Sequence, residues 1–244
     1  MVEISTRRSL MSHLAILSLD GVFLLLRVLH FFFGVVWIGH LYYLNFTQAP
    51  FFAETDADTK SNAIQKLLPR ALWWFRWGAM GTFITGWMYL AMRGHRDGFA
   101  LFTTSWGIFI ILGAILGSIM WANVWFVIWP NQQKVIASAC AVAAGKTALP
   151  EAAALATRAS IASRHNVLFS IPMLLFMGSA SHLPMMVTAT SLIPLVIALT
   201  AALTAIEWNA VCGKMGPLAS IKGVIHAGFS LSIALYLLIE VLTK

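Results

Sequence analysis

Long apolar runs separated by short polar segments dominate the pattern of the chain. About 20 consecutive apolar residues are what an α-helix needs to cross the hydrocarbon core of a bilayer. The pattern therefore predicts an all-α, polytopic transmembrane helical bundle of about six spans, forming a single membrane domain over residues 1–244. The expected spans are 20–46, 71–92, 104–129, 161–183, 191–212 and 219–242.

Prolines and polar residues set the expected ends of these spans. Pro50 and the acidic loop 54–58 are expected to end the first span, and Pro130, followed by a polar run, is expected to close the third. The alanine-rich stretch 135–160 is only moderately polar and suits an amphipathic helix outside the membrane. Gly113 and Gly117 have the G-x-x-x-G spacing that permits close contact between two helices.

Composition supports an integral membrane protein and argues against several other classes. The chain is 59% hydrophobic and 10% charged, whereas a soluble domain has about 25% charged residues. Two cysteines, Cys140 and Cys212, are too few for a disulfide framework, a zinc cluster or a C-x-x-C-H haem attachment. The net charge of +7 is spread over loops, which gives nucleic-acid binding no support. The first apolar run follows Arg7 and Arg8 without a small-residue cleavage site, which predicts a retained first helix rather than a signal peptide.

The distribution of basic residues between the loops predicts the orientation in the membrane. An even number of spans places both termini on one side, and the loops of the other side hold more basic residues. By the positive-inside rule the termini face the periplasm of a bacterial inner (cytoplasmic) membrane, with the lipid bilayer as the immediate partner. The basic residues assigned to the inner side are Lys60, Lys66, Arg70, Lys134, Lys146, Arg158, Arg164, Lys214 and Lys222. Those assigned to the outer side are Arg7, Arg8, Arg93, Arg96 and Lys244.

Five histidines fall within the expected spans, at two depths. His30 and His182 match in depth toward the outside, and His40 matches His226 and His165 toward the inside. Two histidines from different helices at one depth are the axial ligands that a six-coordinate haem b requires. The sequence therefore nominates these histidines as cofactor ligands for one or two haem b groups. The alternative is hydrogen bonding across helices, and a non-haem metal site lacks carboxylate partners.

Three charged residues, Arg27, Arg76 and Glu207, are expected to be buried within the spans. Ionisable side chains at membrane depth are costly, and they usually face the bundle interior and serve a function. Arg27 is placed to bind a haem propionate or another anionic ligand from the outside. Arg76 and Glu207 could pair with each other, or Glu207 could belong to a proton path. The sequence contains no nucleophile–histidine constellation, phosphate loop or paired catalytic carboxylates, so no catalytic residue is assigned.

Three segments of the chain, residues 37–46, 123–132 and 163–177, match a known family of membrane enzymes in their pattern. The Trp-Pro-Asn sequence at 129–131 is the most specific part, because generic hydrophobicity would not generate it. These segments resemble the membrane domain of the bacterial membrane-bound, cytochrome c-linked urate oxidases, also called urate hydroxylases. The resemblance covers the first four expected spans well and the last two loosely.

The resemblance implies a membrane oxidase that converts urate to 5-hydroxyisourate and passes electrons to a c-type cytochrome domain fused at its C-terminus, outside the cytoplasm. It also favours His30 and His182 over His40 and His165 as the shared site. This chain departs from the family pattern, because it ends at Lys244 after its last expected span and has no C-x-x-C-H sequence. Either a separate cytochrome accepts the electrons, or the chain is a relative of this family that serves as a membrane subunit of another complex.

Three functions follow from these observations. The leading hypothesis is a haem b electron-transfer subunit, which passes electrons between a substrate or partner dehydrogenase and cytochrome c or quinone. The second is a urate-oxidising enzyme that uses a separate cytochrome c. The third is a haemless accessory or scaffold subunit of a larger respiratory or oxidase complex. The expected partners are thus respiratory or other oxidoreductase subunits.

Overall fold

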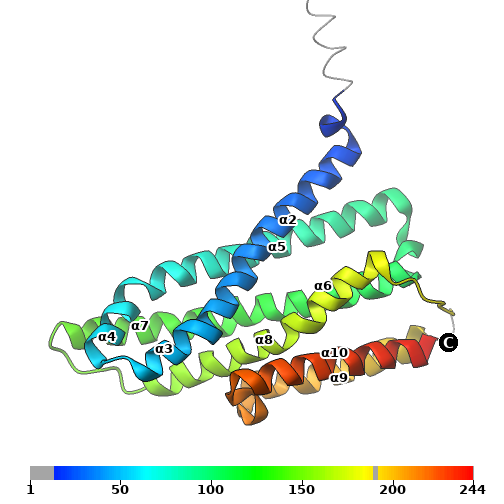
Figure 1. Ribbon diagram of the computed structural model, residues 1–244. Coiled ribbons are helices and arrows are strands. Elements are labelled where there is room, and N and C mark those ends of the chain that lie inside the picture. Colours follow the sequence, from blue (N-terminus) through cyan, green and yellow to red (C-terminus); the bar gives the residue numbers. More distant parts are fainter. Residues whose placement is uncertain (1–13, 189–191, 244) are drawn as a thin grey trace, which may run out of the picture.

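A computed structural model, which describes residues 14–188 and 192–243, shows long helices joined by short connections and, within those residues, no strand (Figure 1). The expected all-α fold is confirmed. The elements are η1 (Ala15–Leu17), α2 (Leu19–Tyr42), η2 (Tyr43–Gln48), α3 (Ala49–Glu54), α4 (Ala57–Lys66), α5 (Leu68–Asp97), η3 (Phe99–Thr103), α6 (Ser105–Ala122), η4 (Asn123–Ile128), α7 (Trp129–Ala143), α8 (Ala152–His182), α9 (Leu192–Cys212), η6 (Gly216–Ala219) and α10 (Ile221–Thr243).

Several helices begin at a polar residue that caps the first turn. The side chains of Ser18, Asp56 and Thr104 each accept a hydrogen bond from the backbone N–H three residues later, at 2.8–3.3 Å. Such caps satisfy backbone donors that the first helical turn leaves free. Gly98, at φ +85°, ends α5 and turns the chain into η3.

Two helices continue through a proline by way of a π-helical turn. The turn η2 precedes Pro50 and the turn η4 precedes Pro130, so the chain stays helical as far as Glu54 and Ala143. Neither proline ends its helix, whereas the acidic loop expected to close the first span does begin where α3 ends, at Glu54. Proline lacks an N–H and clashes with the carbonyl one α-turn earlier, and a wider turn before it relieves that conflict.

The alanine-rich stretch 135–160 is not one amphipathic helix. Helix α7 ends at Ala143, the chain turns at Gly145 with φ +75°, and α8 begins at Ala152. The left-handed conformation at the glycine interrupts helical hydrogen bonding. Helix α8 therefore starts before the expected span at 161, and it ends at His182, close to the expected boundary.

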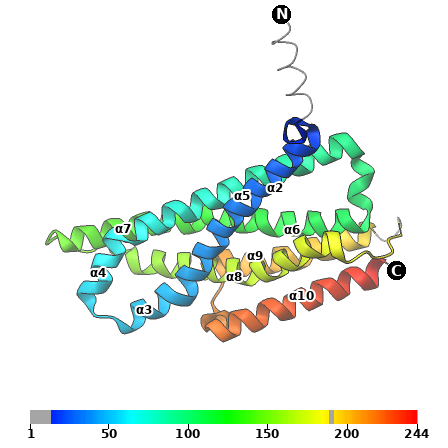
Figure 2. The same cartoon turned by 45° about the horizontal axis from the view of Figure 1, so that its top comes forward.

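The bundle is built from pairs of long helices (Figures 1 and 2). Helix α2 packs along α5, α6 packs along α8, and α10 lies against α8 with α9 beside it. A Cβ added to Gly113 would lie 3.0 Å from Met177 Cγ, so this glycine allows the close contact between α6 and α8 that the G-x-x-x-G spacing predicts. The largest fully buried side chains are Trp37, Phe75, Phe109, Phe169 and Phe176.

Among the residues that the structure describes, four helical segments are long and apolar enough to cross a membrane. Large apolar side chains such as Phe31, Val35, Phe126 and Trp208 are exposed on the surface, which suits contact with lipid. The chain is thus a membrane protein. The remaining long helices, α5 and α8, have 30 and 31 residues but are less apolar, and six spans stay a prediction. The four segments are Leu19–Glu54, Ser105–Ala143, Leu192–Cys212 and Ile221–Thr243.

Candidate functional site

A buried network of polar side chains joins η4, α8 and α9. Asn123, the first residue of η4, donates from Nδ2 to Asn166 Oδ1 at 3.1 Å and to Glu207 Oε2 at 3.2 Å. Asn166 in turn donates from its own Nδ2 to the Met120 carbonyl at 2.9 Å. Both asparagines are fully buried. Hydrogen bonds in such apolar surroundings fix the relative positions of the helices, because an unpaired polar group there is costly.

A second hydrogen bond between α8 and α9 lies beside this network and involves His165. Its Nδ1 lies 2.9 Å from the Ile161 carbonyl, which can only accept, so Nδ1 holds the proton and donates it. Nε2 then accepts a hydrogen bond from Asn209 Nδ2 at 3.0 Å. With both ring nitrogens engaged, His165 is a helix-packing group in this arrangement. Asn209 was not anticipated, although a polar residue two positions after Glu207 in an apolar run is a usable signal.

His30 lies in the seam between α2 and α5. Its Nδ1 donates to the Thr82 carbonyl at 3.0 Å, and Thr85 Oγ1 lies 3.3 Å away. A Cβ on Gly86 would fall 2.9 Å from His30 Cε1, so the absence of a side chain there makes room for the ring. Nε2 has no hydrogen-bond partner among residues 14–188 and 192–243. A backbone carbonyl that fixes one nitrogen is the arrangement that prepares the other to bind a metal.

His40 faces a second opening between α2 and α5. Its Nδ1 donates to the Val36 carbonyl one turn earlier at 2.7 Å. The ring lines a surface pocket of about 470 Å³, which Tyr43, Arg70 and Trp74 also line. His40 is therefore half-buried and accessible from the surface of the bundle.

The other predicted site residues lie at the surface. His182 is exposed at the end of α8, where its Nδ1 donates to the Gly178 carbonyl at 2.9 Å, and His226 is exposed on α10. The guanidinium of Arg27 is exposed and lies 5.5 Å from the centre of the Tyr89 ring. No contact between two of the five candidate histidines is found in the described part of the chain, so their pairing around haem stays a prediction.

His30 and His182, the pair expected at one depth, can be located relative to a contact between α2 and α8. Tyr42 and Ser170 join α2 to α8 through a hydrogen bond of 2.9 Å between their hydroxyls. Each histidine lies twelve residues along its helix from that bond, a distance of about 18 Å. Beyond the bond, however, α2 diverges from α8 and continues along α5 (Figures 1 and 2). The two histidines are thus equally far along their helices from this bond but lie on diverging helices, and their match in depth stays a prediction.

Arg76 is held by tryptophans rather than by a carboxylate. Its guanidinium carbon lies 3.8 Å from the centre of the Trp129 ring, with Trp77 and Trp125 at 5.9 and 5.8 Å. Its Nε is buried without a hydrogen-bond partner within the described residues. The ion pair between Arg76 and Glu207 that the sequence allowed is not present. Glu207 accepts a hydrogen bond from Asn123, and Arg76 lies over Trp129. Cation–π contacts stabilise the arginine in this partly desolvated position.

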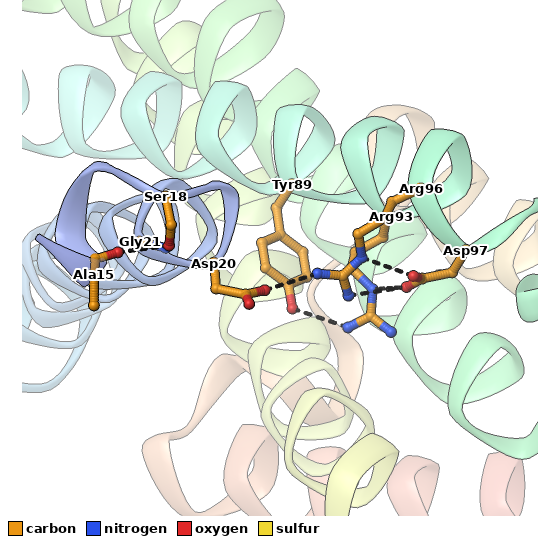
Figure 3. A network of polar contacts seen from close by, with 8 residues as sticks. All are labelled: Ala15, Ser18, Asp20, Gly21, Tyr89, Arg93, Arg96 and Asp97. Atoms are coloured by element: carbon orange, nitrogen blue, oxygen red, sulfur yellow. Dashed lines mark hydrogen bonds and ion pairs between the residues drawn. The ribbon is translucent and has the colours of Figure 1, made fainter. Parts of the chain in front are cut away.

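A network of charged side chains ties the start of α2 to the end of α5 (Figure 3). Arg93 and Arg96 both donate to the Asp97 carboxylate, Arg96 at 2.7 Å, and Arg96 also donates to Asp20 at 3.0 Å. Arg93 further donates to the Tyr89 hydroxyl at 3.3 Å. The hydrogen bond from Arg96, followed by that from Arg93, lowers the pKa of Asp97 below its ordinary value.

The comparison with known families identifies the part of the chain that contains the buried network. A family model described as urate oxidase N-terminal matches residues 98–230. Asn123, Asn166 and Glu207 all lie in this range, whereas His30 and His40 precede it. A search of curated proteins and a search of solved structures found no match. Because the matched range covers more than half of the residues, the chain belongs to the urate oxidase N-terminal family.

Proposed function

We propose that this chain is the membrane domain of a cytochrome c-linked urate-oxidising system, which converts urate to 5-hydroxyisourate in the bacterial inner membrane. Its six spans would place both termini in the periplasm, where a separate c-type cytochrome accepts the electrons. One observation carries the proposal: the range that matches the urate oxidase family encloses the buried network of Asn123, Asn166 and Glu207.

The chemistry of the reaction suits a carboxylate held in this network. Urate and water give 5-hydroxyisourate with the release of two protons and two electrons. Glu207 is an ionisable group at membrane depth, and its neighbours Asn123 and Asn166 are neutral amides that leave it free to gain or lose a proton. Glu207 is therefore the group that we assign as the acceptor of a released proton.

A second candidate function, haem b electron transfer, is favoured by the geometry of His30. Its Nδ1 is bound to the Thr82 carbonyl, which leaves Nε2 available as an iron ligand. The sequence nominates His182, or alternatively the pair His40 and His226, as further ligands and Arg27 as a partner for a propionate. The described helices do not bring these histidines together, since α2 packs on α5 and diverges from α8. When bound, haem would supply one-electron transfer from the substrate that is being oxidised to the cytochrome.

Urate-dependent reduction of added cytochrome c by membranes containing the chain tests the proposed function. Glu207→Gln should slow the reaction about a hundredfold, the usual scale for loss of a group that transfers protons. Glu151→Gln is the matched control, because Glu151 is exposed and its side chain forms no cap bond. Absence of urate turnover by the wild-type chain with cytochrome c present would overturn the proposed reaction.

The haem b function has a separate test in the reduced-minus-oxidised spectrum of the purified chain. The expected result is a b-type α-band that is lost in His30→Ala. A spectrum without haem from freshly isolated, active protein would exclude haem electron transfer while leaving urate oxidation standing.

A further inference from the structure

An apolar groove runs along the surface of the bundle between α6 and α9. Its volume is about 630 Å³, which lies in the range that binding sites for small organic molecules occupy. Helix α9 packs against α8 and α10, and its remaining face borders the groove. Apolar side chains form most of the walls, among them Ile111, Ile115 and Ile119 of α6 and Leu195, Leu199 and Leu203 of α9.

One end of the groove contains a carboxylate. Glu207 lines the groove, and its Oε2 accepts the hydrogen bond from Asn123 at 3.2 Å. Its Oε1 accepts no hydrogen bond from any residue that the structure describes. The groove thus combines a long apolar wall with one strong acceptor that is connected to the buried network.

We propose that this groove binds an isoprenoid quinone, with its ring beside Glu207 and its tail along α6 and α9. From Glu207 to Leu192 the groove follows α9 for about 22 Å, which suits an extended isoprenoid chain. A quinol hydroxyl donates to the free Oε1, whereas the apolar tail replaces lipid against the isoleucine and leucine side chains.

The assignment of the quinone as an electron acceptor rests on the proposed urate oxidation. Urate and water yield 5-hydroxyisourate, two electrons and two protons. A quinone takes up both electrons and both protons to become a quinol. The quinol then passes one electron to each of two molecules of the c-type cytochrome and releases two protons, so that the cytochrome remains the final acceptor. Glu207 lies between the buried network and the groove, so a proton accepted in the network passes to the quinone oxygen beside it.

A phospholipid is a poorer occupant of this groove. Glu207 lies five residues before Cys212, the end of α9, which places it about 7.5 Å along the helix from that end. A lipid phosphate drawn to this position would bring a second negative charge beside the carboxylate in surroundings of low dielectric constant. A quinone ring is neutral and avoids that repulsion.

A photoreactive quinone, applied to the full chain in phospholipid nanodiscs without urate, tests the binding. The expected labelling is on peptides of α6 and α9. Val196→Trp should remove most of it by filling the groove, and Ile197→Trp should leave it intact. The two residues are neighbours with exposures of 60% and 63%, but only Val196 lines the groove.

Two results would overturn the proposal. Equal labelling of the two variants would show that the quinone is not in the groove, and full displacement of the label by added phospholipid would assign the groove to lipid. Because this test needs no turnover, it is independent of the proposed function. If the wild-type chain is labelled as expected but does not reduce cytochrome c with urate, the proposed urate oxidation is contradicted and the proposed quinone binding is not.

Discussion

Asn123 and Glu207 are joined by a hydrogen bond of 3.2 Å that ties the π-helical turn η4 to α9. The same amide nitrogen also donates to Asn166, so one side chain connects three helices. The π-helical turn begins at Asn123, and it allows the helix to continue through Pro130. The network thus depends on a local deviation from α-helical geometry, a kind of feature that is frequent at functional sites.

Replacing Asn123 should destabilise the bundle. In Asn123→Ala, Asn166 Oδ1 and Glu207 Oε2 both lose their donor. Asn166 is fully buried, and a buried unsatisfied group costs about 1–3 kcal/mol. The expected result is a lower unfolding temperature of the detergent-solubilised protein. Asn131→Ala is the control, since Asn131 is only half-buried and outside the network. Equal unfolding temperatures for the two variants would contradict a stabilising role of the network.

A methyl group at Gly86 should displace the His30 ring. The added Cβ would lie 2.9 Å from His30 Cε1, a distance that forces the ring or α5 to move and costs about 1–3 kcal/mol. Gly34→Ala on α2 is the matched control, because a Cβ there meets nothing within 4 Å. Thermal unfolding of the two variants separates the clash with His30 from the general effect of replacing glycine by alanine in a helix. A stability of Gly86→Ala equal to that of wild type would show that the seam between α2 and α5 has room for the added methyl group.

The stacking of Arg76 on Trp129 should distinguish arginine from lysine. A lysine keeps the charge but loses the planar group that lies 3.8 Å from the ring centre, so Arg76→Lys should cost about 1–2 kcal/mol. Arg158→Lys, at an exposed position of α8, should have no effect on the free energy of unfolding. A loss of stability in Arg158→Lys as large as in Arg76→Lys would instead indicate a general effect of replacing arginine by lysine, independent of the contact with Trp129.

The charged network at the start of α2 should weaken in acid. The lowered pKa of Asp97 means that its contribution to stability is present above the ordinary value of 3.8 and is lost as the pH falls through the folded-state value below it. The unfolding temperature of Asp97→Asn should therefore lie below that of wild type at neutral pH and approach it below pH 3.8. Glu54→Gln, which removes an exposed carboxylate distant from these arginines in the sequence, is the control. A difference between wild type and Asp97→Asn that does not change with pH would contradict the assignment.

The sequence by itself determined the helical class and the ends of the last two helices. Apolar runs of the length of a membrane span, separated by polar turns, leave few alternatives to helices. The helices observed at Leu192–Cys212 and Ile221–Thr243 match the expected spans closely for this reason. Neither Pro50 nor Pro130 ends its helix, because a chain in apolar surroundings keeps its backbone groups bonded by widening the turn before the proline. The acidic loop that begins at Glu54 was the correct signal for the end of the first helix.

The partners of the polar side chains were decided only by the tertiary structure. Residue counting predicts that His30 and His182 lie at equal depth in the membrane, and each is twelve residues from the Tyr42–Ser170 bond. It could not reveal that α2 diverges from α8 and packs on α5, because apolar faces along a membrane helix do not specify which neighbour they contact. The same limit hid the bond between His165 and Asn209. Depth follows from position in the sequence, whereas contact depends on how the helices cross.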